Sequence, residues 1–259
     1  MSNEKSDEPA RLGNLLLQTG VALIKSGAGS SRVIKNLSRF ANAYGYEANV
    51  DLATRNISIS LHKEKRGNIF SGSRSIASLP GANFRVISVI SRLSWDVMEK
   101  KISLEEYANV INQVPDIPTY KRNVILFFTG IAGSAFCYTF GGNVMEMVLT
   151  FLATVIGLFF KQELVIKKYN PFMVTFGSAM LASAVIAISS KVLGVETNLE
   201  HAFATSILFL IPGVLLINSF VDLLDGHIIN GIDRGTNALM HAFSIAAGLA
   251  TVLYIFKML

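Results

Sequence analysis

The feature that most restricts the fold of this chain is a series of five long apolar runs in its second half. Each run is close to the ~20 residues that an α-helix needs to cross a hydrocarbon core about 30 Å thick. A soluble core can contain one such run, but five in succession with short polar joints predict a membrane protein of about five transmembrane helices. The predicted spans are residues 123–140, 143–160, 171–189, 203–221 and 238–256.

Charge is distributed unevenly along the 259 residues. The chain is 51% hydrophobic and only 16% charged, whereas soluble domains are about a quarter charged. Most of the Lys, Arg, Asp and Glu residues lie before Arg122. This split predicts two domains, a soluble one over residues 1–120 and a transmembrane one over residues 121–259.

The hydrophobic period changes within the first domain. Apolar residues recur at helical spacing in two segments, which end at Gly27–Gly29 and at Gly45. Alternation of apolar and polar residues then predicts three strands. They lie near residues 46–52, 57–61 and 68–73. Two further helices follow, and Ser103 with Glu106 forms a capping box at the start of the second. We therefore expect a cytoplasmic α+β domain followed by an α-helical bundle.

Basic residues beside the spans predict the orientation, because cytoplasmic loops carry an excess of Lys and Arg. One side of the predicted bundle has six such residues and the other has two. The six are Lys121, Arg122, Lys161, Lys167, Lys168 and Arg234, and the two are Lys191 and Lys257. No secretory signal is visible in the first 20 residues. The N-terminus is therefore expected in the cytoplasm and the C-terminus outside.

Small residues recur on the predicted spans at spacings that place them on one helix face. Ala242, Ala246 and Ala250 do so on the last span, and Gly130 and Ser134 on the first. Such residues let helix backbones approach closely. We expect a compact bundle in the lipid bilayer, able to pack against a partner or against a second copy of the chain as a homo-oligomer.

The dipeptide Pro212-Gly213 lies in the middle of the fourth predicted span. Proline lacks a backbone N–H and crowds the carbonyl one turn earlier, near Leu208, so the helix should kink or break there. Broken helices at membrane depth expose backbone dipoles, which transporters use to hold ions and polar substrates. A purely structural kink explains the same residues, and both interpretations stay open.

Polar residues follow this break. Asn218, Asp222 and Asp225 are spaced by four and three residues, so they share one face of a continued helix. Intramembrane carboxylates usually face a cavity or a partner, and Arg234 is the obvious partner for either one. The alternative is an ordinary solvated loop from Asp222 onward. The predicted substrate or ion path comprises Pro212, Gly213, Asn218, Asp222, Asp225 and Arg234, with His227 as a proton relay.

Other candidate sites are weaker. The residues Gly27–Ser31 suggest a phosphate loop, but the Gly-Lys-Ser/Thr ending is missing and the glycines follow a helix. A tight helix–helix turn with a serine N-cap is the favoured interpretation. Glu146 is a further carboxylate candidate, either intramembrane or interfacial. Because His201 and His241 are isolated on different spans, no metal site is predicted.

Several function classes are disfavoured by what the sequence contains. The single cysteine, Cys137, cannot form an intramolecular disulfide. The net charge of +5 accompanies no recognised nucleic-acid motif and no basic helix with interleaved aromatics, so nucleic-acid binding is not expected. No nucleophile–base pair or cofactor loop stands out, so the chain is predicted to be neither an enzyme nor dependent on a cofactor.

Two regions together resemble the bacterial threonine/serine exporter family, and the resemblance covers almost the whole chain. The first is Leu210-Ile211-Pro212-Gly213 continuing through Asn218, Asp222, Gly226, Gly231 and Arg234. The second is Gly27-Ala28-Gly29-Ser30-Ser31-Arg32-Val33, with Gly45 and the strand from Thr54 to Ser60. No single motif has the specificity of a zinc-ligand quartet.

Full-length exporters of this family carry about ten spans, whereas five are predicted here. The chain therefore resembles the larger subunit of split, two-component exporters such as the succinate exporter. This resemblance implies a second small membrane subunit and a location in the bacterial inner membrane. It also implies efflux of a small polar metabolite, either threonine or serine, or a dicarboxylate such as succinate.

Residue chemistry leaves both substrates open. A dicarboxylate would rely on helix N-termini, Asn218 and Arg234, because the predicted spans contain no Lys or Arg. A zwitterionic amino acid could place its ammonium at Asp222 and its carboxylate at a broken-helix N-terminus. A different class of function is a membrane-anchored sensor or assembly module that acts through its cytoplasmic domain, since nearly half of the chain is soluble.

Overall fold

The computed structural model describes residues 4–53, 55–63, 67–76, 81–100, 102–117, 120–193 and 199–256. They form two compact units. Unit 1 is drawn from residues 1–118 and 214–235, and unit 2 from residues 119–213 and 236–259. Thr54, at the start of the strand that contributes to the family resemblance, and Lys257 of the orientation count lie outside the described residues.

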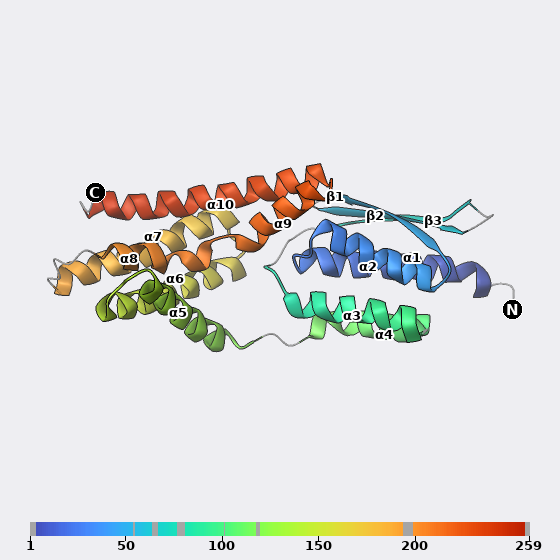
Figure 1. Ribbon diagram of the computed structural model, residues 1–259, viewed down its shortest axis with the longest axis horizontal. Coiled ribbons are helices and arrows are strands. Elements are labelled where there is room, and N and C mark those ends of the chain that lie inside the picture. Colours follow the sequence, from blue (N-terminus) through green and yellow to red (C-terminus); the bar gives the residue numbers. More distant parts are fainter. Residues whose placement is uncertain are drawn as a thin grey trace. The chain divides into compact units, whose positions relative to one another are not determined.

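Unit 1 contains the predicted helices and small sheet, which are confirmed (Figure 1). Its elements before residue 118 are α1 (Glu4–Lys25), α2 (Ser30–Ala43), β1 (Glu47–Ala53), β2 (Asn56–Lys63), β3 (Gly67–Ser75), α3 (Phe84–Lys100), α4 (Leu104–Gln113) and the 3₁₀ turn η1 (Val114–Asp116). Helix α9 (Gly213–Leu224) and the first residues of α10 (Ile228–Ile255) complete the unit.

The three strands form an antiparallel sheet in the order β1-β2-β3. On the central strand Ile57, Ile59 and Leu61 are fully buried while the residues between them are more exposed, as the period-two pattern predicts. Val50 pairs with Ile59 and fixes the register of the first hairpin. The buried face of the sheet joins the core that helices α1 to α4 also build.

Two tyrosines sit where α2 and α4 meet this core. Tyr107 is fully buried, stacks on Phe40 with ring centroids 4.3 Å apart, and shares a 2.7 Å hydrogen bond with the hydroxyl of Thr19. Tyr44 donates a 3.0 Å hydrogen bond to the carbonyl of Ile102. The predicted capping box at the start of α4 is confirmed. Both phenols therefore act in the fold as neutral groups.

Unit 1 is expected to lose stability in alkaline solution because of these phenols. Burial and the charge of Glu106 raise the pKa of Tyr44 from 10.0 to about 12, and burial raises the pKa of Tyr107 further. Above pH 10 the unfolded chain releases protons that the folded chain keeps, so the free energy of unfolding should fall between pH 10 and about 12.

Denaturant titrations of the detergent-solubilised chain at pH 9 and pH 11 test this, with the fluorescence of Trp95, the one tryptophan, as the probe. Trp95 lies on α3 in unit 1. The variant Tyr44→Phe should show a shallower decline with pH. Equal stability at both pH values, or an unchanged slope in the variant, would contradict this role of the tyrosines.

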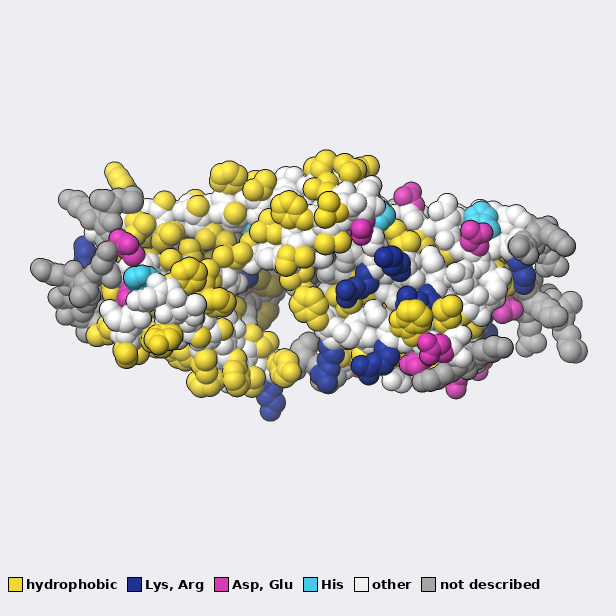
Figure 2. All heavy atoms as spheres, in the orientation of Figure 1, with side chains coloured by type: hydrophobic (Ala, Val, Ile, Leu, Met, Phe, Trp, Pro, Cys, Tyr) yellow, Lys and Arg dark blue, Asp and Glu magenta, His cyan; other side chains and the backbone are white. Residues whose placement is uncertain are grey.

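Unit 2 consists of helices with many exposed hydrophobic side chains, and on the face shown in Figure 2 several Lys and Arg side chains gather on unit 1. Its elements are α5 (Arg122–Thr139), α6 (Val144–Ile166), α7 (Pro171–Leu193), α8 (Glu200–Ser206), the 3₁₀ turn η2 (Leu208–Leu210) and the rest of α10. Exposed hydrophobic residues on such helices suit a lipid environment.

Three of the described helices are long and apolar enough to cross a membrane, or four if one bent pair counts as a single span. They are Val144–Ile166, Pro171–Val192 and Ile228–Ile255, and the pair is Glu200–Leu210 with Gly213–Leu224. The first predicted span is helical as α5 but is not among them. The count of five spans therefore stays a prediction.

Two helices extend beyond the predicted spans. Helix α10 begins at Ile228, before the span predicted from residue 238, so Arg234 lies within a helix. Helix α6 continues to Ile166, past the span predicted to end at residue 160, and includes Lys161. Both differences arise because a helix can extend past its apolar run when its polar end finds protein partners.

Candidate functional site

The predicted break at Pro212 is confirmed. The 3₁₀ turn η2 ends at Leu210, Ile211 and Pro212 are outside any helix, and α9 begins at Gly213. The turn before the break has the i→i+3 hydrogen bond of a 3₁₀ helix, in which the N–H of Ile211 donates to the carbonyl of Leu208 over 3.1 Å. Pro212 has no N–H to extend the ladder, so a new helix starts after it.

Asp222 on α9 is the centre of a buried polar cluster in unit 1. Its side chain is fully buried, and its two carboxylate oxygens accept 3.0 Å hydrogen bonds from the backbone N–H and the hydroxyl of Ser30. The solvated-loop interpretation was therefore wrong for Asp222. A carboxylate at the first residue of α2 also suits the positive end of that helix.

The expectation of a serine N-cap at the glycine turn was wrong as well. The N-cap of α2 is Gly29, which has no side chain to offer, and Ser30 is the first helical residue. Asp222 supplies the missing acceptor from a different helix. The α2 N-terminus is thus capped by a residue far away in the sequence, which makes the cap a tertiary contact.

Arg234 on α10 balances the buried carboxylate. Its Nε lies 3.3 Å from Oδ2 of Asp222, and the side chain is only 13% exposed. It also donates a 3.0 Å hydrogen bond to the carbonyl of Ala28. The predicted pairing of Arg234 with Asp222 is confirmed in geometry. Because buried charges are stable only when paired and hydrogen-bonded, these contacts depend on one another.

Two asparagines complete the same cluster. Asn218 donates a 2.9 Å hydrogen bond to the carbonyl of Gly27, whose φ of 79° requires glycine. Asn230 donates to the hydroxyl of Ser30 over 3.2 Å and to the carbonyl of Leu52 on β1 over 3.1 Å. We call the turn Gly27–Ser31 together with Asn218, Asp222, Asn230 and Arg234 the junction cluster.

Close packing of α9 against α10 presents these side chains to the turn. A Cβ on Gly231 would lie 2.7 Å from Leu223, and one on Gly235 would lie 2.8 Å from the hydroxyl of Ser219. That hydroxyl donates a 2.7 Å hydrogen bond to the carbonyl of Gly231. A Cβ on Gly231 would also lie 3.0 Å from the backbone oxygen of Ser219, so this position of the first resembling region favours glycine.

The remaining predicted path residues lie at the edge of the cluster. The carboxylate of Asp225, at the exposed end of α9, accepts a hydrogen bond from the hydroxyl of Ser31. His227 is half-buried in the turn to α10, and its backbone N–H donates to the carbonyl of Asp222 over 2.8 Å. The structure thus brings Asn218, Asp222, Asp225 and Arg234 to one turn of unit 1.

Unit 2 contains a second buried carboxylate, Glu146 at the start of α6. Its side chain is 3% exposed and forms a capping box with Asn143. The same carboxylate lies 3.3 Å from Nδ1 of His201 and 3.4 Å from the backbone N of Ala202. His201 is therefore not isolated, because a carboxylate lies beside it. Nδ1 of His241 lies 2.9 Å from the hydroxyl of Thr175.

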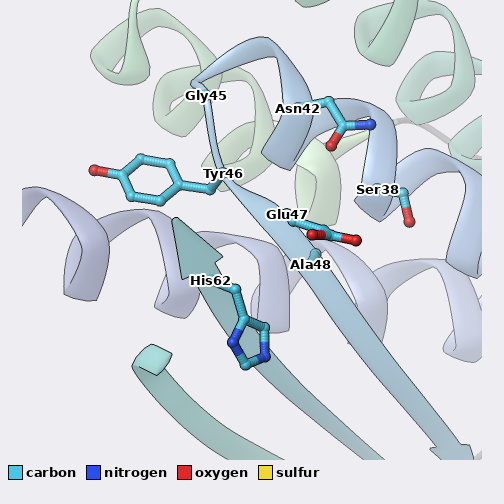
Figure 3. Close-up of a pocket in the computed structure, with 7 residues that line it drawn as sticks. All are labelled: Ser38, Asn42, Gly45, Tyr46, Glu47, Ala48 and His62. Atoms are coloured by element: carbon cyan, nitrogen blue, oxygen red, sulfur yellow. The ribbon is translucent and has the colours of Figure 1, made fainter. Parts of the chain in front are cut away.

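A separate cavity of about 490 Å³ lies between the end of α2 and the β1–β2 hairpin. Figure 3 shows its lining, with Ser38 and Asn42 on the helix, and Glu47 and His62 on neighbouring strands. Glu47 and His62 are cross-strand partners. None of the predicted path residues lines it. Among the described residues, no group of three or more His, Cys, Asp or Glu could hold a metal ion.

Comparison with known proteins identifies relatives over nearly the full length. A family model described as "Putative threonine/serine exporter" matches residues 14–256. A protein of Klebsiella aerogenes named "Probable succinate transporter subunit YjjP" is 24% identical over 249 residues, which cover 96% of this chain and 95% of the relative. A protein of Escherichia coli K12 with the same name is 24% identical over 253 residues, covering 97% of each chain. No solved structure gives a significant match.

Proposed function

The chain belongs to the threonine/serine exporter family, and we propose that it is one subunit of a secondary-active exporter in the bacterial inner membrane. The exported solute is a small polar metabolite, either threonine or serine, or a dicarboxylate such as succinate. The observation that carries the proposal is the break at Pro212 in an otherwise apolar helix pair. Such breaks leave backbone groups available to ions and substrates.

The proposed path begins at Pro212 and Gly213 and leads to the junction cluster. Asn218, Asp222 and Arg234 hold α9 and α10 against the turn Gly27–Ser31, with Asp225 and His227 at its exposed edge. Because these bonds share the same residues, a movement of α9 during transport would affect all of them together. In this proposal the helices that form the turn Gly27–Ser31 take part in transport, which they would not if the path lay wholly within the membrane.

A second membrane subunit is part of the proposal. The two relatives are named as transporter subunits, and the three or four candidate spans among the described residues are few for an alternating-access bundle. The basic residues beside the predicted spans favour a cytoplasmic N-terminus and an external C-terminus. Small residues on the helices suit tight association with such a subunit or with a second copy.

The test is efflux from bacteria that lack their own exporters for succinate and threonine. Cells loaded with each labelled solute would produce the chain alone, or together with a candidate small membrane subunit of the same family. We expect faster efflux of one solute class when both proteins are present, and its loss when the proton gradient is collapsed. Unchanged efflux of all the solutes in every strain would contradict the exporter and favour the sensor or assembly role.

A further inference from the structure

Lys161 on α6 has an environment that differs from those of the other cations in unit 2. It is partly buried, and within the described residues it has neither an ion pair nor a hydrogen bond. Two residues further along, Glu163 is already occupied by Arg122, with Nη1 of the arginine against its carboxylate. A cation within an apolar bundle is costly unless an anion reaches it.

Phe209 lies beside Lys161, immediately before the break at Pro212. The Nζ of Lys161 is 6.0 Å from the ring centre of Phe209. The same ring passes close to α6 one turn earlier, because a Cβ on Gly157 would lie 3.0 Å from its Cζ atom. Gly157 and Lys161 share a helix face at i and i+4. The cation therefore faces the segment where the helix pair breaks.

His241 on α10 adds a titratable group within electrostatic range of Lys161. The hydroxyl of Thr175 on α7 donates to the carbonyl of Pro171 over 3.0 Å, so it accepts from Nδ1–H of His241 over 2.9 Å. This assignment leaves Nε2 of His241 as its free ring nitrogen. Near Lys161, an added negative charge would be favourable and an added positive charge would not.

Hydroxyl groups without partners lie on the same two helices. Thr154 on α6 precedes Lys161 by two turns, and Ser178 on α7 follows Thr175 by one. Both are buried, and within the described residues neither side-chain oxygen has a hydrogen-bond partner. Buried hydroxyls normally have one. They would serve as donors to oxygen atoms of a bound solute.

We propose that Lys161 is the carboxylate-binding residue of the exporter, and that the transported solute is a small dicarboxylate anion. This inference rests on the proposed function. An amino acid would bring its ammonium to an environment that holds a cation and, among the described residues near it, no acidic partner. A dicarboxylate can place one carboxylate at Lys161, while the other accepts hydrogen bonds from the hydroxyls of Thr154 and Ser178.

Binding of labelled succinate to the full chain in phosphatidylcholine nanodiscs tests this directly. The variant Lys161→Met should weaken succinate binding about tenfold or more, because a charge-assisted hydrogen bond is lost. Lys161→Arg should retain most of the affinity. The control Lys191→Met removes an exposed cation near Phe256 and should leave binding unchanged. Unlabelled threonine should not compete.

Equal succinate affinity in Lys161→Met and in the original chain would overturn the inference, as would failure of the original chain to bind succinate. Loss of binding only after phosphatidylglycerol is added would also overturn it, since Lys161 would then pair with a lipid phosphate. The efflux experiment stays independent. If cells export the solute but binding does not depend on Lys161, the exporter function stands and the role of Lys161 is refuted. If binding depends on Lys161 but cells show no efflux, only the exporter function is refuted.

Discussion

Replacing Asp222 with alanine is expected to lower the free energy of unfolding by about 3–5 kcal/mol, the loss typical when one partner of a buried ion pair is removed. Arg234, whose side chain is 13% exposed, would lose the carboxylate with which it forms an ion pair. The N–H and hydroxyl of Ser30 would lose both of their acceptors on Asp222, and the first turn of α2 would have no cap.

Denaturant titration with the fluorescence of Trp95 measures this loss in unit 1. The control is Asp51→Ala, which removes an exposed carboxylate from β1 and should change stability by less than about 0.5 kcal/mol. The double variant Asp222→Ala/Arg234→Leu should recover part of the loss, because the uncompensated charge is gone. A double variant as unstable as the sum of both single ones would show that the pair is not coupled.

Gly248→Leu is expected to destabilise unit 2 by about 3 kcal/mol or more, at the upper end of the overpacking range. A Cβ at this position would lie 2.6 Å from the backbone oxygen of Phe176 and 2.9 Å from the Cβ of Ala179 on α7. A backbone oxygen cannot rotate away as a side chain can. The two helices would therefore have to separate along their contact.

Thermal denaturation in detergent, followed by gel filtration, compares this variant with Ala247→Leu. Ala247 is exposed on the neighbouring position of α10, so its enlargement meets no helix within unit 2. We expect a clear loss of folded protein for Gly248→Leu and little change for the control. Equal behaviour of the two variants would show that α7 and α10 do not pack at this glycine.

Local chemistry made several elements predictable from sequence. The capping box at Ser103 and Glu106 needs only residues three apart, and the strand of Ile57, Ile59 and Leu61 needs only a period of two. The break at Pro212 follows from a missing N–H. Each depends on neighbours in the chain, so the sequence contains the information directly.

The rest of the candidate site depends on contacts that no local pattern reveals. Asp222 and Ser30 are 192 residues apart, and nearly all of α9 belongs to the same unit as α1 to α4. Dividing the chain by composition into a soluble part followed by a membrane part could not assign α9 to unit 1. One signal was available, because the glycine turn and the Asp222 segment were the two regions that resembled the family. Lys161 was missed because α6 extends beyond its apolar run.

We propose that the junction cluster is needed for export and not only for folding. The most direct measurement is efflux of loaded solute from cells producing Asp222→Asn, whose amide keeps an acceptor for Ser30 but loses the charge that pairs with Arg234. At equal amounts of folded protein, we predict efflux roughly tenfold or more below that of the original chain, with Asp51→Asn unaffected. Efflux from cells producing Asp222→Asn that equals efflux from cells producing the original chain would contradict a role of the junction cluster in export.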